Sequence, residues 1–214
     1  MSGVRAAAAE VAEAERVLSE GGLALMPTDT VYGLCAALDS SDGRDALYAL
    51  KGRDPAQPCQ VLIYSPDVLT TLVEPLGDGL RAAVGALLPG QVTCIVPDPW
   101  NRCDAAAGDN PGTVGLRAPA VSGALLNFET ILMATSANEP GGPDPRLLEE
   151  VPFRIAAGVG YELDAGPLPG VASAVVDLRP LADAGPARLV RTGPDPEAVA
   201  ETLAEVSVRL APAG

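Results

Sequence analysis

The stretch that decides the fold class is Leu23-Ala24-Leu25-Met26-Pro27-Thr28-Asp29-Thr30-Val31-Tyr32-Gly33-Leu34. Residues 23–26 form a short apolar run after two glycines, and such a run predicts a buried strand. Pro27 ends the strand, because proline cannot donate to the hydrogen-bond ladder. Residues 28–30 then predict a polar loop, and a helix is expected before the strand, over about residues 4–20. A helix that leads into a fully apolar strand is typical of an α/β sheet.

The same alternation continues along the whole chain. Strands are predicted at 61–64, 92–96, 113–117, 131–135, 174–178 and 187–191, and helices at 43–51, 67–73, 78–88 and 196–210. Asp42 is expected to cap the helix that starts at residue 43. The length of 214 residues favours one large domain over two small ones. The sequence therefore predicts a single α/β domain over residues 1–214, with a twisted mixed sheet and flanking helices.

Polar side chains follow several of these strands. Thr30 follows the first strand, Ser136 and Asn138 follow the strand at 131–135, and Arg117 and Arg191 end two others. Ligands of open α/β sheets bind beyond the carboxyl ends of the strands, so these residues are expected to meet in an open cleft there. The alternative is that they are ordinary turn and cap residues.

Charge sets limits on the ligand. The formal net charge is −14, which opposes unspecific binding to nucleic acid or to anionic membranes. The single lysine lies in Lys51-Gly52-Arg53, where an ammonium and a guanidinium flank one glycine. This pair predicts a clamp for a phosphate or a carboxylate. The alternative is a pair of solvated surface cations.

The chain has no histidine, which excludes a Ser-His-Asp triad and the commonest metal ligand. The spacing of its four cysteines fits neither a zinc site nor a dense disulfide framework. An enzyme with this composition is expected to act by positioning and electrostatics, or with a metal held mainly by substrate phosphates. Reduced thiols are expected, as in a cytoplasmic protein, and acidic residues near the N-terminus argue against a signal sequence. No apolar run approaches the ~18 residues that a membrane span needs, so no such span is expected.

Seven motifs in order resemble those of the YrdC-like family, whose best-known members are threonylcarbamoyl-AMP synthases. They lie in a core of about residues 21–193, at 27–34, 51–53, 88–93, 113–119, 134–138, 173–177 and 190–193. The resemblance implies an α/β fold with a positively charged cleft. It also implies a reaction in which L-threonine, bicarbonate and ATP give threonylcarbamoyl-AMP and pyrophosphate, with Mg²⁺ bridging the ATP phosphates. The product is expected to serve a downstream transferase that makes t6A at tRNA position 37.

The resemblance also implies roles for single residues. The residues expected to hold threonine are Thr30, Arg117, Ser136 and Ser173, with Arg117 as the fork for its carboxylate. Lys51 and Arg53 are expected to be catalytic. The residues expected to contact ATP are Arg53, Gln57, Thr113, Asn138, Arg146 and Arg191, and no protein-held metal site is expected.

The chain departs from the family pattern in the phosphate region. Asp54 follows the clamp, Gln57 stands where a lysine or asparagine is usual, and Leu62 stands where some members have histidine. Pro140, Asp144 and Arg146 replace hydroxyl-bearing residues. Two alternatives therefore stay open: an enzyme of this fold that acts on another amine, or a non-catalytic module that binds nucleotide or double-stranded RNA.

Overall fold

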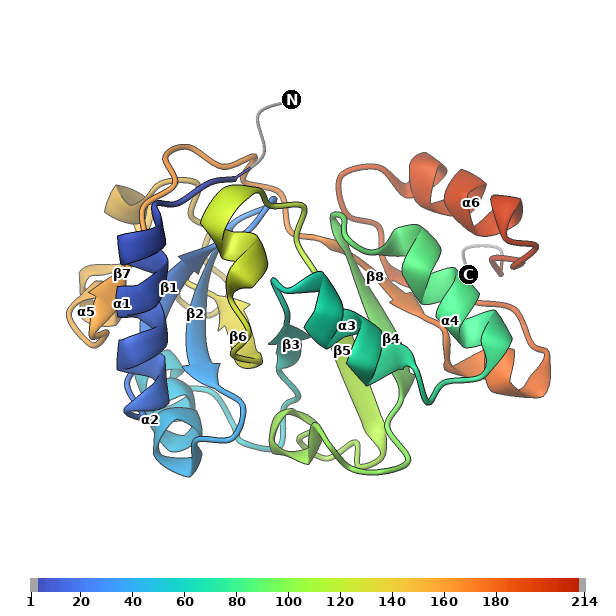
Figure 1. Cartoon of the computed structure of the whole chain (residues 1–214), viewed down its shortest axis with the longest axis horizontal. Coiled ribbons are helices and arrows are strands. Elements are labelled where there is room, and N and C mark those ends of the chain that lie inside the picture. The colour runs from blue at the N-terminus through green and yellow to red at the C-terminus, as the bar shows by residue number, and fades with distance from the viewer. Residues whose placement is uncertain (1–3, 212–214) are drawn as a thin grey trace.

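The apolar run after Gly22 is a strand with all four residues buried, as the sequence predicts: β1 (Ala24–Pro27). The computed structural model describes residues 4–211, and β1 belongs to a nine-stranded sheet (Figure 1). The other strands are β2 (Tyr32–Ala37), β3 (Gln60–Leu62), β4 (Val92–Pro97), β5 (Thr113–Arg117), β6 (Leu132–Ser136), β7 (Tyr161–Glu162), β8 (Ala174–Asp177) and β9 (Arg188–Arg191).

Within residues 4–211, six α-helices and several short 3-10 helices accompany the sheet. The α-helices are α1 (Ala8–Ser19), α2 (Ser41–Lys51), α3 (Pro66–Val73), α4 (Asp78–Leu87), α5 (Phe153–Ala156) and α6 (Pro196–Glu205). Figure 1 shows α1 across one end of the sheet and α4 with α6 at the other. Within residues 4–211, every helix is too short or too polar to span a lipid bilayer.

The strand order is β7-β1-β2-β6-β3-β5-β4-β8-β9. Three neighbouring pairs are parallel, namely β1 with β7, β3 with β5, and β4 with β8, and the others are antiparallel. The predicted mixed sheet with flanking helices is therefore confirmed. Because neighbours in the sheet come from distant parts of the chain, loops far apart in sequence end beside one another.

The sheet is buried on both faces near β1. Ala24 and Met26 belong to the same apolar cluster as Leu18 of α1, whereas Leu25 belongs to the cluster that holds Leu47 of α2. Successive side chains of a strand point to opposite faces, so α1 and α2 cover opposite sides of β1. This explains why the strand reads as a continuous apolar run.

Three predicted boundaries are wrong for local reasons. The first helix begins at Ala8 instead of residue 4, because Val4 pairs with Val121 as an extended bridge. Ser40, not Asp42, caps α2, and its hydroxyl accepts a hydrogen bond from the Gly43 amide at 3.0 Å.

The C-terminal helix also ends earlier than predicted, at Glu205 instead of residue 210. Ser207 has a left-handed φ of 61°, and the Val208 amide donates back to the Leu203 carbonyl at 2.9 Å. Such a left-handed residue usually is glycine, so the sequence carries no stop signal here. The chain then pairs with Ala187, whose amide donates to the Arg209 carbonyl.

Gly193, in the last of the seven motifs at 190–193, packs against the main chain of Ala174 because it has no side chain. Its φ is +67°, and a Cβ there would lie 2.3 Å from the Ala174 amide nitrogen. We expect Gly193→Ala to lower the free energy of unfolding by clearly more than the ~1–2 kcal/mol of a left-handed alanine. Gly123→Ala is the matched control, because Gly123 has a φ of +70° with no atom near its Cβ position. Urea denaturation measures both, and equal losses would contradict the steric argument.

Candidate functional site

A cleft of about 410 Å³ opens over the middle of the sheet. Its floor is made by alternate residues of four adjacent strands: Gln60 and Leu62 of β3, Thr113, Gly115 and Arg117 of β5, Thr93 and Ile95 of β4, and Val175 of β8. The residues between them, such as Val61, Cys94 and Leu116, are buried in the core. The sequence predicts a cleft beyond the strand ends, and this is only partly right. One face of the sheet forms the floor of the cleft, and the loops at the strand ends form its walls.

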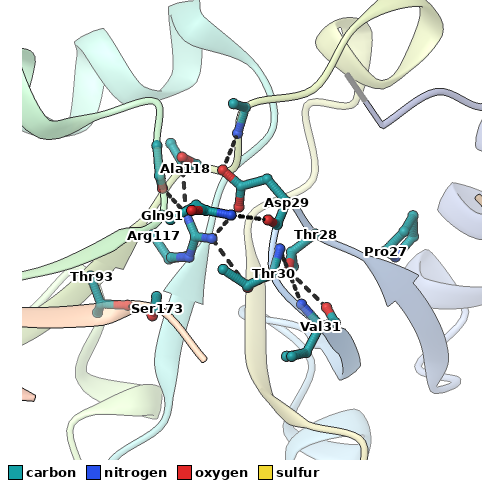
Figure 2. Close-up of polar contacts among 12 residues, drawn as sticks. Pro27, Thr28, Asp29, Thr30, Val31, Gln91, Thr93, Arg117, Ala118 and Ser173 are labelled. Atoms are coloured by element: carbon teal, nitrogen blue, oxygen red, sulfur yellow. Dashed lines mark hydrogen bonds and ion pairs between the residues drawn. The ribbon is translucent and has the colours of Figure 1, made fainter. Parts of the chain in front are cut away.

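Arg117, which lines the cleft, forms a buried ion pair with Asp29 behind the lining (Figure 2). Arg117 is 1% exposed. Its Nη2 donates to Asp29 and, at 3.3 Å, to the Thr30 hydroxyl, while Nη1 donates to the carbonyl oxygens of Gly90 and Ala118. Arg117 is predicted to bind the carboxylate of threonine, but in this structure all four of its Nη hydrogens bind acceptors of the protein itself.

Asp29 ties further segments to this pair. Its second oxygen accepts a hydrogen bond from the Ala120 amide at 2.9 Å, and its main-chain carbonyl accepts one from the Gln91 side chain at 2.5 Å. The pair thus joins the loop after β1, the end of β5 and the turn before β4. Removing one partner of a buried pair leaves an uncompensated charge, which typically costs about 3–5 kcal/mol.

Thr28 shapes the loop that carries Asp29. Its buried hydroxyl contacts the Thr30 hydroxyl at 2.8 Å, donates to the Val31 carbonyl at 2.7 Å, and accepts from the amides of Thr30 and Val31. Such local bonds stabilise a tight turn. They hold the Thr30 hydroxyl against Arg117 at the cleft wall.

Two further hydroxyls, those of Thr93 on β4 and Ser173 just before β8, line the cleft. The Ser173 hydroxyl lies 2.9 Å from that of Thr93, and Thr93 donates to the Gln60 side chain at 3.1 Å. Arg191 donates to the Ser173 carbonyl at 2.8 Å and to its hydroxyl at 3.2 Å. Burial lowers the pKa of Arg191, and nearby Asp144 partly offsets that effect.

Lys51 and Arg53 flank the C-terminus of α2. Gly52 takes a left-handed φ of 62°, and the Arg53 amide bonds back to the Tyr48 carbonyl, which ends the helix. The Arg53 guanidinium donates to the Thr135 hydroxyl, the Gln57 side chain and the Pro58 carbonyl. The glycine of this motif therefore lets two successive cations leave the helix in different directions.

The Lys51 ammonium is turned inward. Its three hydrogens go to the Ser136 carbonyl at 2.8 Å, the Asn138 carbonyl, and the Asn138 side-chain oxygen at 2.6 Å. Burial, followed by the charge of Arg53, lowers the pKa of Lys51 to about 8. Lys51 thus fixes the turn after β6 and keeps a positive charge close behind Ser136.

The predicted site residues divide into two groups. Those that line the cleft are Thr30, Arg53, Thr113, Arg117, Ser136, Ser173 and Arg191. Those that lie outside its lining are Lys51, Gln57, Asn138 and Arg146. Gln57 accepts from Arg53 at 3.0 Å, Asn138 accepts from Lys51 and Ser136, and Arg146 donates to the Leu168 carbonyl at 3.1 Å. These four residues support the wall rather than form it in this structure.

The sequence analysis missed Thr93, Arg179 and the pairing role of Asp29. Thr93 stands directly opposite Arg117 in the antiparallel pair of β4 and β5. Alternate residues of a strand share one face, so Thr113, Gly115 and Arg117 of the predicted strand at 113–117 point to the same side of the sheet. Applied to the neighbouring strand, that alternation would have placed Thr93 in the cleft.

The cations of the site differ in how they are neutralised. Arg117 is paired with Asp29, and Arg179 is paired with Asp177 at 2.8 Å. Lys51, Arg53 and Arg191 make hydrogen bonds only to uncharged oxygens, and none of the three has a carboxylate ion-pair partner within the described residues. Three uncompensated cations around one cleft favour an anionic ligand.

Comparisons with known proteins identify relatives of the chain. The sequence pattern of the Sua5/YciO/YrdC family, described as "telomere recombination", matches residues 16–193. A protein of Mycobacterium tuberculosis (strain H37Rv), provisionally named threonylcarbamoyl-AMP synthase, is 36% identical over 198 residues, which is 90% of this chain and 88% of the relative. The threonylcarbamoyl-AMP synthase of Chromohalobacter salexigens is 30% identical over 174 residues, 79% of this chain and 92% of the relative.

A solved structure extends the likeness to three dimensions. The crystal structure of P. abyssi Sua5 complexed with L-threonine matches with a TM-score of 0.78 at 28% identity. The match covers 98% of this chain but only 61% of the archaeal one, so the chain spans about three fifths of that protein. The resemblance inferred from the seven motifs is thereby confirmed, and the chain belongs to the Sua5/YciO/YrdC family.

Proposed function

We propose that the chain makes L-threonylcarbamoyl-AMP and pyrophosphate from L-threonine, bicarbonate and ATP, for the t6A modification of tRNA. The curated relatives support its assignment as an enzyme of the threonylcarbamoyl-AMP synthase class. The observation that carries the proposal is the pairing of two subsites in one cleft. Hydroxyls gather around Arg117, and the uncompensated cations Arg53 and Arg191 line the same cavity.

The chemistry needs positioning more than proton transfer. The threonine amine captures bicarbonate as a carbamate with loss of water. A carbamate oxygen then attacks the α-phosphorus of ATP, and the bond to the departing pyrophosphate breaks. In this scheme Arg53 and Arg191 neutralise phosphate charge, which suits a chain without histidine.

The threonine subsite is proposed at Thr30, Ser136, Ser173 and Arg117. The Arg117 Nη2 contact with the Thr30 hydroxyl is 3.3 Å long, so it is one of the weaker bonds of that guanidinium. A substrate carboxylate that enters beside Thr30 can take this hydrogen while the Asp29 pair stays intact. The hydroxyls of Thr30, Ser136 and Ser173 already have protein partners, and each keeps acceptor capacity for the substrate's own donors.

Mg²⁺ is proposed to arrive with ATP and to neutralise its phosphates. No group of three or more His, Cys, Asp or Glu side chains that could hold a metal exists within residues 4–211. Mg²⁺ at nucleotide sites commonly takes one or two carboxylates and otherwise phosphates and water. The cleft lining offers one carboxylate, that of Asp144.

Pyrophosphate release tests the proposal directly. We expect release from ATP only when L-threonine and bicarbonate are both present, with threonylcarbamoyl-AMP identified by mass spectrometry. Release that depends on a different amine would instead support an enzyme with another substrate. No release with any amine, together with retained ATP binding, would support a binding module and contradict the proposal.

The cations of the 51–53 motif are expected to matter for turnover. We expect Arg53→Ala and Lys51→Ala each to lower kcat/KM at least tenfold, about 1.4 kcal/mol, the first by loss of a phosphate contact and the second by release of the turn after β6. Arg16→Ala removes an exposed arginine paired with Glu13 and Glu20 and serves as the control. Unchanged kinetics in both motif variants, measured by pyrophosphate release, would rule out these roles.

A separate prediction concerns Arg117. Arg117→Lys keeps one charge but cannot reach Asp29, Thr30 and two carbonyls at once. We expect the dissociation constant of L-threonine to rise at least tenfold and that of ATP to change less than threefold, as measured by calorimetry. A larger loss of ATP affinity than of threonine affinity would show that the subsites are assigned the wrong way round.

The lowered pKa of Lys51 predicts a pH effect on nucleotide binding. Above a pH of about 8 the ammonium loses its proton, so the positive field behind Ser136 falls. We expect ATP affinity to decrease by threefold or more between about pH 7 and about pH 9.5, a window in which ATP loses no negative charge. Lys51→Met should bind ATP more weakly and without this slope. A wild-type affinity that is independent of pH would contradict the assignment.

A further inference from the structure

Asp144 is the sole carboxylate among the cleft-lining residues in the described part of the chain. It lies in the segment between β6 and the short 3-10 helix at Leu148–Glu150. One of its oxygens accepts a hydrogen bond from the Asn138 amide at 3.2 Å. No ion pair forms with a neighbouring cation among residues 4–211. Burial lowers the pKa of both Lys51 and Arg191, and the negative charge of Asp144 offsets part of that lowering.

The backbone holds Asp144 in this place. The next residue, Pro145, accepts a hydrogen bond from the Tyr32 amide at 3.2 Å, and the carbonyl of Arg146 accepts one from Leu168 at 2.8 Å. On the other side, the Asn138 amide bonds to the Gly142 carbonyl at 2.8 Å. These bonds hold the main chain on both sides of Asp144 and so keep the residue at the cleft.

This arrangement creates a conflict for a phosphate ligand. Lys51, Arg53 and Arg191 attract phosphates, and Asp144 sits near two of these cations with the same sign of charge as the phosphate. Like charges that share one cleft repel each other, so the Asp144 carboxylate opposes a phosphate bound there. A divalent cation between the carboxylate and the phosphates turns this repulsion into two attractions.

The donor chemistry fits such a cation. Mg²⁺ is usually bound through one or two carboxylates together with substrate phosphates and water. Asp144 uses one oxygen in its single hydrogen bond to Asn138, and its other oxygen has no hydrogen-bond partner within the described residues. The side chain is half-exposed, so water can complete the coordination.

We propose that Asp144 is the protein ligand, direct or through one water, of the Mg²⁺ that accompanies the nucleotide. It thereby makes nucleotide binding conditional on a divalent cation. The inference rests on the proposed function, because it takes the ligand to be ATP. The cations alone would bind ATP with or without a metal ion. The carboxylate makes the cleft prefer ATP that carries Mg²⁺.

The test is calorimetric binding of ATP to the full chain with Mg²⁺ and with EDTA. For the unaltered protein we expect removal of Mg²⁺ to weaken ATP binding at least tenfold. Asp144→Asn keeps the size of the side chain and an oxygen that accepts from Asn138. In this variant we expect metal-free ATP to bind at least threefold more tightly than in the unaltered protein. We also expect the effect of Mg²⁺ to shrink below threefold.

Glu139→Gln is the matched control. Glu139 is a carboxylate of the same segment whose charge also reaches Lys51, but it is paired with Arg154 outside the cleft lining. We expect it to keep the magnesium effect of the unaltered protein. Circular dichroism melts of the three proteins check that each is folded.

A second readout uses Mn²⁺ in place of Mg²⁺. Electron paramagnetic resonance should show Mn²⁺–ATP immobilised on the unaltered protein, with a changed Mn²⁺ environment in Asp144→Asn. An equal magnesium effect in the unaltered protein and in Asp144→Asn would overturn the inference and leave the proposed function intact. Absence of ATP binding in every variant and condition would overturn both.

Discussion

The buried ion pair of Arg117 and Asp29 is the constraint on which the rest of the site depends. It brings together the loop after β1, the end of β5 and the turn before β4, which lie far apart along the sequence. Arg117 is almost fully enclosed, so its charge must be compensated within the protein. The polar loop at 28–31 supplies that compensation through Asp29, and the same loop places the Thr30 hydroxyl beside Arg117.

Compensation of Arg117 also gives the cleft regions of different charge. A neutral pair surrounded by hydroxyls suits a small zwitterionic ligand, whose own charges need local hydrogen bonds rather than a strong net field. Lys51, Arg53 and Arg191 have no carboxylate ion-pair partner within the described residues, and the positive charge that they bring to the cleft suits phosphates. A strongly acidic protein can therefore hold an anionic ligand, because the cations are concentrated in one place.

Much of the fold could be predicted from the sequence, because buried strands leave long apolar signals. The strand at 113–117 was predicted with its observed bounds. The end of α6 could not be predicted, because a serine takes the left-handed position where glycine is the usual signal. The motifs pointed to Arg53, Ser173 and Arg191, and the structure brings all three to one cleft. Whether they hold the substrates stays a prediction.

Other parts of the site depend on contacts that no local pattern encodes. Lys51 resembled a free clamp in the sequence, yet its hydrogens are taken by the turn after β6, some 85 residues further along. The partnership of Asp29 with Arg117 joins residues 88 positions apart. The floor of the cleft required the register of four strands, which follows from the strand order of the finished sheet.

A crystal structure with L-threonine, Mg²⁺ and a non-hydrolysable ATP analogue tests the central claim most directly. The account predicts phosphates beside Arg53 and Arg191, the amino acid between Thr30 and Ser173, and an unbroken pair of Arg117 and Asp29. Phosphates bound at Arg117 in place of Asp29, or an amino acid located among Arg53 and Arg191, would contradict it.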